Sequence, residues 1–173
     1  GYFNLPKVLE LALHDGVDPR SGKRLGPATG DPAAWEGMEA LFAAFRVQLR
    51  HLLDVKLAGN AAIERLYAEH MPAPFLSVLT DDCVARGRDY HDGGARYNTR
   101  YVQGVGIGSV TDGLAAIEEL VFTSKAEGMG GLVAALDADF AEREPLRQRL
   151  VNRCPKYGND DDRADEWMRR VFE

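Results

Sequence analysis

One β-rich stretch stands alone among segments with helical spacing, and this constrains the fold more than any other feature. Residues 97–103 (YNTRYVQ) combine aromatic and β-branched side chains, which are typical of a strand. Glycines at positions 104, 106 and 108 follow, and then a segment with helical spacing. This order indicates a β-to-α unit. Because a lone strand cannot make a sheet, we expect its partner strands to come from elsewhere.

The first helix is predicted over residues 5–13, which are almost wholly apolar. Asn4 stands at the N-cap position, and Pro6 falls in the first turn, where a missing N–H does no harm. Gly16 is placed to end the helix in the left-handed conformation. A helix this apolar must be buried on most sides. We therefore expect other protein to cover it, and we expect the chain to be an internal piece of a longer protein.

The rest of the chain is mostly helical by pattern. Asp31 and Pro32 predict the start of a long amphipathic helix that runs to about His70, with Gly59 as a candidate kink. Residues 17–31 are turn-rich and predict a small hairpin or an ordered loop. Further helices are predicted over residues 75–85, 132–140 and 146–151. Another is predicted to begin at the capping residues Thr111 and Asp112, and a last one to begin at residues 160–162. The fold class is therefore a helix-dominated α/β protein.

Composition excludes several classes of function. The formal net charge is −6 and no basic stripe is present, so we expect no nucleic-acid partner. No apolar run approaches the roughly 20 residues that a membrane helix needs, so we expect no membrane association. No basic start precedes an apolar stretch, as a secretory signal would require, and we predict a cytoplasmic protein. The four histidines are scattered without a metal-ligand spacing, so no metal site is predicted.

Three other patterns have both a chemical and a structural interpretation. Cys83 and Cys154 lie far apart; a disulfide is the alternative, and reduced cytosolic thiols are favoured. The alternating glycines suggest a nucleotide loop, but the spacing is not G-x-G-x-x-G, so close packing is favoured. The acidic run at 159–162 (NDDD) suggests calcium, but no EF-hand spacing follows, so helix capping is favoured.

Several motifs resemble those of a known family, in the family's own order along the chain. They are residues 1–13 (GYFNLPKVLELAL), 15–19 (DGVDP), 81–83 (DDC), 93–98 (GGARYN), 103–106 (QGVG), 111–115 (TDGLA) and 155–162 (PKYGNDDD). The chain is identified by these motifs as similar to glycyl-radical enzymes of the pyruvate formate-lyase-like group. The resemblance covers essentially the whole of residues 1–173 and is most specific at 155–162.

The resemblance implies a fold and a chemistry. The family fold is a ten-stranded α/β barrel around two loops, one with a cysteine in a Gly-Cys-Val-Glu motif and one with a glycine in an Arg-Val-x-Gly-Tyr motif. An iron–sulfur activating enzyme uses S-adenosylmethionine to install the glycyl radical, which generates a thiyl radical that takes hydrogen from a small organic substrate. The resemblance further implies an anaerobic, cytoplasmic enzyme, and we expect the parent enzyme to be a homodimer.

This sequence lacks both radical motifs. No Gly-Cys-Val-Glu and no Arg-Val-x-Gly-Tyr occurs, and neither cysteine is at the catalytic position. We therefore expect residues 1–173 to be an internal portion of one pyruvate formate-lyase-like domain, with the barrel incomplete. We also expect the chain to be inactive alone and to have no catalytic residue and no cofactor bound directly.

The resemblance suggests two substrate-binding residues, Tyr2 and Gln103. A phenol at the position of Tyr2 lines the pocket in the dehydratase-like branch and can bind a substrate hydroxyl or carboxylate; the alternative is an aromatic that packs where the first helix begins. Gln103 can face the barrel interior, although bonding to backbone groups is favoured. Residues 1–5 and 95–103 look most like the hydroxyproline dehydratase and arylacetate decarboxylase branch.

The motifs and the resemblance leave three candidate functions for the chain. The first is a segment of a glycyl-radical lyase, a dehydratase or decarboxylase. The second is a non-catalytic, truncated or split remnant that binds a partner, and the third is a formate acetyltransferase of the same family. A nucleotide-binding α/β domain is a further class, against which the glycine spacing argues.

Overall fold

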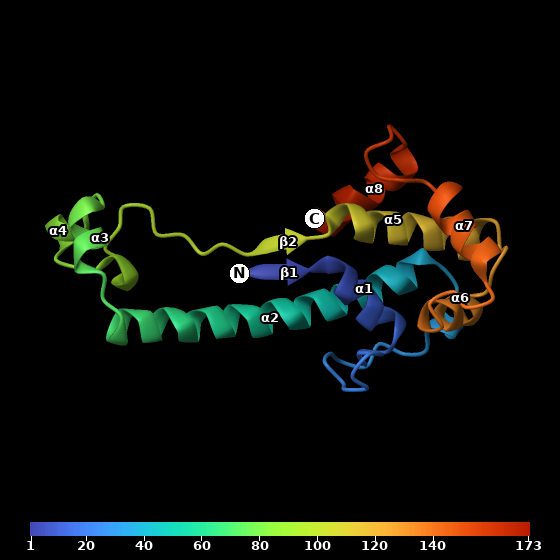
Figure 1. Cartoon of the computed structure of the whole chain (residues 1–173), viewed down its shortest axis with the longest axis horizontal. Coiled ribbons are helices and arrows are strands. Elements are labelled where there is room, and N and C mark those ends of the chain that lie inside the picture. The colour runs from blue at the N-terminus through green and yellow to red at the C-terminus, as the bar shows by residue number, and fades with distance from the viewer. The chain divides into compact units, whose positions relative to one another are not determined.

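The structure is a computed structural model that describes all 173 residues (Figure 1). Two three-residue strands, β1 (Tyr2–Asn4) and β2 (Gln103–Val105), form a two-stranded sheet. The α-helices are α1 (Leu5–Leu13), α2 (Met38–His70), α3 (Pro74–Leu79), α4 (Cys83–Arg86), α5 (Ile107–Ile117), α6 (Met129–Asp137), α7 (Glu144–Asn152) and α8 (Asp162–Phe172). Short helices η1 (Pro32–Ala34), η2 (Tyr90–Asp92) and the π-helix η3 (Glu118–Thr123) complete the chain. The helix-dominated fold with an incomplete sheet is therefore confirmed.

The chain divides into two compact units. One, unit 1, consists of residues 1–2 and 52–103; the other, unit 2, consists of residues 3–51 and 104–173. No helix in either unit is long and apolar enough to cross a membrane.

Unit 2 holds nearly all of the buried apolar core. Helix α5 packs against both α1 and α8. The core side chains that are almost fully buried include Val8, Leu11, Leu41, Phe45, Val110, Leu114, Leu120 and Leu132. The prediction that residues 5–13 form a buried helix is confirmed, because α1 buries six of its nine residues. Asn4 accepts a hydrogen bond from the Lys7 N–H (3.3 Å), and Gly16 has the predicted left-handed φ of 77°.

An aromatic and cationic cluster joins α8 to the first part of α2 within unit 2. The Trp167 and Phe42 rings lie 5.6 Å apart, and the Arg170 guanidinium lies over both rings, 4.4 Å from the Phe42 centroid. Arg170 also binds Glu39 at 2.9 Å. The Trp167 indole N–H donates to Glu118 at the start of η3 (2.7 Å). Stacking, charge and a hydrogen bond therefore hold α8 in place together.

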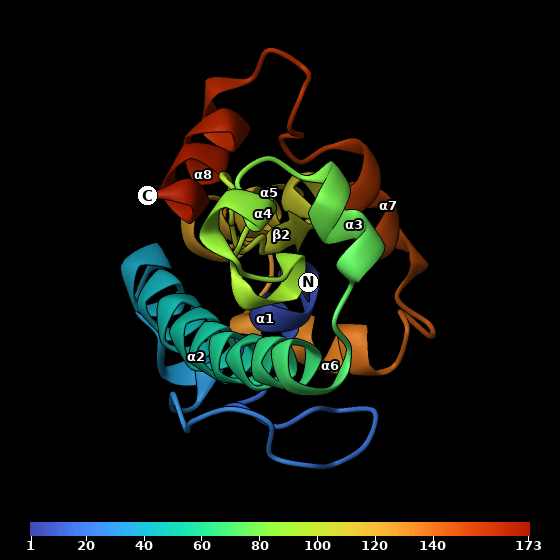
Figure 2. The same cartoon turned by 90° about the vertical axis from the view of Figure 1, so that its left-hand side faces the viewer.

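Unit 1 has almost no core of its own. Its buried apolar side chains are Cys83 and Ala95, whereas most of the large exposed apolar side chains of the chain belong to this unit. Helices α3 and α4 pack side by side here (Figure 2).

Several predicted boundaries are wrong. Asp31 caps the short helix η1, and the long helix begins only at Met38; it then passes Gly59 without a break. The predicted helix over 75–85 is two helices, because Asp82 has a left-handed φ of 75° between them. Thr111 and Asp112 lie inside α5 and do not cap it, since the helix already begins after Gly106.

The predicted strand is also shorter and later than expected. Residues 97–102 are irregular, and pairing is confined to Gln103–Val105. The β propensity of residues 97–102 is not realised, because a strand needs a neighbour to complete its ladder.

Candidate functional site

The predicted substrate-binding residues Tyr2 and Gln103 lie on neighbouring strands. The Gly1 amino group donates to the Tyr101 carbonyl (2.7 Å), and the Gln103 N–H donates to the Gly1 carbonyl (2.9 Å). These two backbone bonds bring the starts of β1 and β2 together. The Tyr2 side chain is 76% exposed, and the Gln103 side chain is exposed as well. Both polar groups are therefore free to meet a ligand, and whether they bind substrate stays a prediction.

Close packing between the start of α1 and the end of β2 holds the far ends of these two strands together. Gly106 has a φ of 82°, and a Cβ at this position would lie 2.6 Å from Cδ of Pro6. A Cβ at Gly104 would lie 3.3 Å from Leu5. These distances are tighter than ordinary van der Waals contact, so the absence of side chains lets the start of α1 approach the end of β2. Gly104 and Gly106 therefore serve close packing, as predicted, whereas a Cβ at Gly108 would make only an ordinary contact with Tyr157, at 3.6 Å.

A charged cluster supports the start of α1. The Lys7 ammonium binds the carboxylates of Glu10 and Asp18. Its hydrogen bond to Asp18 holds the pKa of that carboxyl well below the ordinary value, and the Ser21 hydroxyl contributes in the same direction. The Asp18 residue is buried, so its charge depends on these partners. The cluster anchors the turn-rich loop of residues 17–31 to α1 and leaves no carboxyl free for acid–base work.

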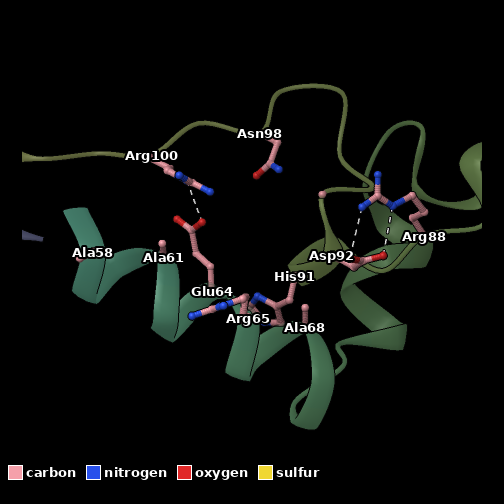
Figure 3. A pocket seen from close by; sticks show the side chains of 11 residues that line it. Ala58, Ala61, Glu64, Arg65, Ala68, Arg88, His91, Asp92, Asn98 and Arg100 are labelled. Atoms are coloured by element: carbon pink, nitrogen blue, oxygen red, sulfur yellow. Dashed lines mark hydrogen bonds and ion pairs between the residues drawn. The ribbon is translucent and has the colours of Figure 1, made fainter. Parts of the chain in front are cut away.

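A polar cleft of about 670 Å³ lies in unit 1, between α2 and residues 88–100 (Figure 3). Two ion pairs lie in its lining. Arg100 binds Glu64 at 2.7 Å, and Arg88 binds Asp92 through two hydrogen bonds of 3.1 and 3.2 Å. The Arg88 guanidinium lowers the pKa of Asp92, so this carboxylate stays ionised at neutral pH. No thiol or hydroxyl lines the cleft, and its carboxylates, guanidinium groups, imidazole and amide can hold polar groups.

Neither cysteine is placed for reaction. Cys83 in α4 and Cys154 after α7 are both buried free thiols, as predicted. Burial raises the pKa of the Cys154 thiol and thus keeps it in the unreactive protonated form.

The acidic run before α8 caps that helix. Asp161 accepts the Arg163 N–H (3.1 Å) and binds the Arg163 guanidinium (2.8 Å). The neighbouring turn is tied to α5, because the Tyr157 N–H donates to Asp112 (2.8 Å). The preference for helix capping at residues 159–162 is confirmed.

The pyruvate formate lyase-like family profile matches residues 1–173. The chain belongs to this family. It is 52% identical to trans-4-hydroxy-L-proline dehydratase of Clostridioides difficile over 99% of its own length and 22% of that protein's. A crystal structure of the C. difficile hydroxyproline dehydratase with trans-4-hydroxy-L-proline bound superposes with a TM-score of 0.96 over the same shares. The glycerol-bound B12-independent glycerol dehydratase of Clostridium butyricum is 32% identical, with a TM-score of 0.91 over 98% of this chain and 21% of that one.

The chain thus spans about a fifth of the length of these relatives.

The polar cleft of unit 1 was not predicted from the sequence. Glu64 and Arg100 are distant in sequence, so only the fold brings them together. The i,i+4 spacing of Arg88 and Asp92 was a signal that could have indicated one side of it.

Proposed function

We propose that this chain is a segment of a glycyl-radical dehydratase whose substrate is trans-4-hydroxy-L-proline or a close analogue. The main support is the 52% identity to the C. difficile dehydratase over 99% of the chain, together with the TM-score of 0.96 to its crystal structure. The likeness to the glycerol dehydratase is weaker in both identity and superposition. This difference supports an amino-acid substrate over a simple diol, and the fact that both relatives are dehydratases supports a dehydratase over a formate acetyltransferase.

The radical chemistry belongs to other parts of the proposed enzyme. The chain has neither the cysteine motif nor the glycine motif, and its two buried thiols do not replace them. We assign no radical step to residues 1–173 and place them within one catalytic domain. The glycyl radical, its installation by an S-adenosylmethionine iron–sulfur enzyme, the homodimer and the anaerobic, cytoplasmic setting are parts of this proposal.

The role of this chain is to bind and orient substrate. In the proposal the Tyr2 phenol donates a hydrogen bond to the substrate carboxylate or hydroxyl, and the Gln103 amide lies on the strand beside it. The exposed Tyr2 side chain and the paired starts of β1 and β2 support this role. The alternatives are that Tyr2 packs where α1 begins and that Gln103 bonds to backbone groups, and only substitution within an active enzyme distinguishes these roles from substrate binding.

A chimera tests the proposal. Residues 1–173 replace the matching segment of the C. difficile dehydratase, and the chimera is activated anaerobically with that enzyme's own activase. We expect the electron paramagnetic resonance signal of the glycyl radical and the loss of water from trans-4-hydroxy-L-proline. A chimera that folds and forms the radical but does not consume this substrate would contradict the proposed substrate.

The Tyr2→Phe variant of the chimera tests the phenol. We expect kcat/KM to fall by about tenfold or more with the radical yield unchanged, because a hydrogen bond to a charged group contributes about 1.5–3 kcal/mol. Tyr101→Phe is the matched control, since Tyr101 is equally exposed and contributes its backbone carbonyl to the strand pair. Equal losses in the two variants would leave Tyr2 with a packing role.

The remnant hypothesis has a separate test. The intact mass of the native protein in its source, measured after immunoprecipitation, should be several times 19.0 kDa, with peptides for both radical motifs. A native mass near 19.0 kDa would contradict the enzyme proposal.

A further inference from the structure

Within unit 1, helix α2 presents a row of polar side chains on one of its faces. Lys56, Asn60 and Glu64 are spaced four residues apart, so they lie above one another on the same side of the helix. All three are half-buried, whereas residues 57–59 and 65–67 are exposed. We call these three residues the α2 stripe. The stripe therefore lies on a face of α2 that other parts of unit 1 cover.

The residue before Tyr2 lies directly on the α2 stripe. A Cβ at Gly1 would collide with Nζ of Lys56 and would lie 3.7 Å from Oδ1 of Asn60. Two side chains of α2 thus fill the space that a side chain at position 1 would take. The side of Gly1 on which a Cβ would stand therefore faces α2.

The pairing of the strands turns Tyr2 the other way. Gly1 donates to the Tyr101 carbonyl and accepts from the Gln103 N–H, which is the pattern of parallel pairing with Gly1 beside Val102. Successive side chains along a strand point to opposite faces. Tyr2 and its neighbour Gln103 therefore point away from α2, which agrees with the 76% exposure of Tyr2.

One ion pair ties the second strand to the same stripe. Glu64 binds Arg100 at 2.7 Å (Figure 3). Arg100 directly precedes Tyr101, whose carbonyl accepts the hydrogen bond from Gly1. The pair therefore connects α2 to the two backbone bonds that hold the start of β1 against the start of β2.

We propose that Glu64, through Arg100, is a positioning residue for the Tyr2 phenol. It holds the strand pair from the face opposite the phenol and does not touch substrate. A substrate contact that is displaced by about 1 Å can slow an enzyme by about 100-fold, so the place of the strand matters for turnover. The inference rests on the proposed function, because Glu64 acts on the reaction through Tyr2.

The expected effect is moderate, because the Arg100 and Glu64 side chains are 63% and 42% exposed and exposed ion pairs are weak. In the activated chimera, we expect Glu64→Gln to lower kcat/KM by about three- to fivefold with the yield of glycyl radical unchanged. The matched control is Asp92→Asn, which removes the carboxylate charge from the other ion pair of the cleft and should leave kcat/KM unchanged.

Two combined variants separate positioning from a general loss of structure. In the Tyr2→Phe background, Glu64→Gln should have no further effect, because residues that act through one another are not additive. The charge exchange Glu64→Arg with Arg100→Glu should restore most of the kcat/KM that either single reversal removes. Additive losses, a charge exchange without recovery, or an unchanged kcat/KM in Glu64→Gln or in Tyr2→Phe would each overturn the proposal.

Hydrogen–deuterium exchange of the full-length chimera tests the strand pair without turnover. In Glu64→Gln, the peptide that contains Gln103 should exchange faster, because the Gln103 N–H loses part of its protection by the Gly1 carbonyl. Asp92→Asn should leave this exchange unchanged. Equal exchange in the two variants would overturn the role of Glu64, whereas a chimera that forms the radical but does not consume hydroxyproline would contradict the proposed substrate and leave the exchange result standing.

Discussion

The variant Gly106→Ala tests the close packing that joins α1 to β2. Gly106 has a φ of 82°, and the new Cβ would lie 2.6 Å from Cδ and 2.7 Å from Cγ of Pro6. The left-handed conformation costs an L-residue about 1–2 kcal/mol. The contact adds about 1–3 kcal/mol, because the ring of Pro6 is rigid and cannot rotate away. We therefore expect the free energy of unfolding to fall by about 2–5 kcal/mol.

A matched glycine separates the two costs. Gly158 has a φ of 83°, but nothing lies within 4 Å of the position that a Cβ would take there, so Gly158→Ala carries the backbone cost alone. Guanidinium unfolding followed by circular dichroism gives both changes, provided that the slope with denaturant is the same in each variant. Equal losses of stability in the two variants would refute the packing argument, because Pro6 would then contribute nothing.

Three further predictions concern buried groups. The hydrogen bond from Lys7 lowers the pKa of Asp18 in the folded protein, so the ionised carboxylate stabilises the fold above the unfolded pKa of 3.8, and this stabilisation is lost as the pH falls through the folded pKa. The free energy of unfolding, measured from pH 6 to 2, should therefore fall less steeply in Asp18→Asn than in the unchanged protein. Trp167→Phe removes the indole N–H that donates to Glu118 and should lower the free energy of unfolding in denaturant by about 2–4 kcal/mol. A decrease of less than about 1 kcal/mol would contradict the importance of this hydrogen bond. Iodoacetamide should alkylate Cys154 slowly in the native protein and rapidly in urea, and rapid native labelling would show that the thiol is not buried.

Local chemistry made part of the fold predictable. The Asn4 cap, the apolar run of α1 and Gly16 each act within a few residues, and all three were correct. The Asp161 cap of α8 was correct for the same reason. Asp31 was correct as a cap but not for the helix predicted, because a capping carboxylate and a proline suit a short 3₁₀ turn as well as an α-helix.

The errors lie where tertiary context decides. Thr111 looked like a cap, yet its side chain is fully buried inside α5, and Asp112 holds the distant Tyr157 turn. Residues 97–102 have strand composition but no strand beside them. The ion pair of Glu64 and Arg100 depends on the path of the chain between them, which no local pattern records.

The π-helix η3 has a consequence for how this chain can vary in length. A π-turn closes its hydrogen bond over one more residue than an α-turn does. Deletion of one residue between Glu118 and Thr123 would let the wide turn close as an α-turn and leave the residues after it near their present places around the helix axis, whereas a deletion within the α-helical part of α5 would rotate them by about 100°. The β2–Gly106–α5 junction precedes this point and would keep its place. We therefore expect single-residue length changes among relatives to be tolerated at the wide turn and excluded from the first half of α5, where a shift would move the strand that carries Gln103.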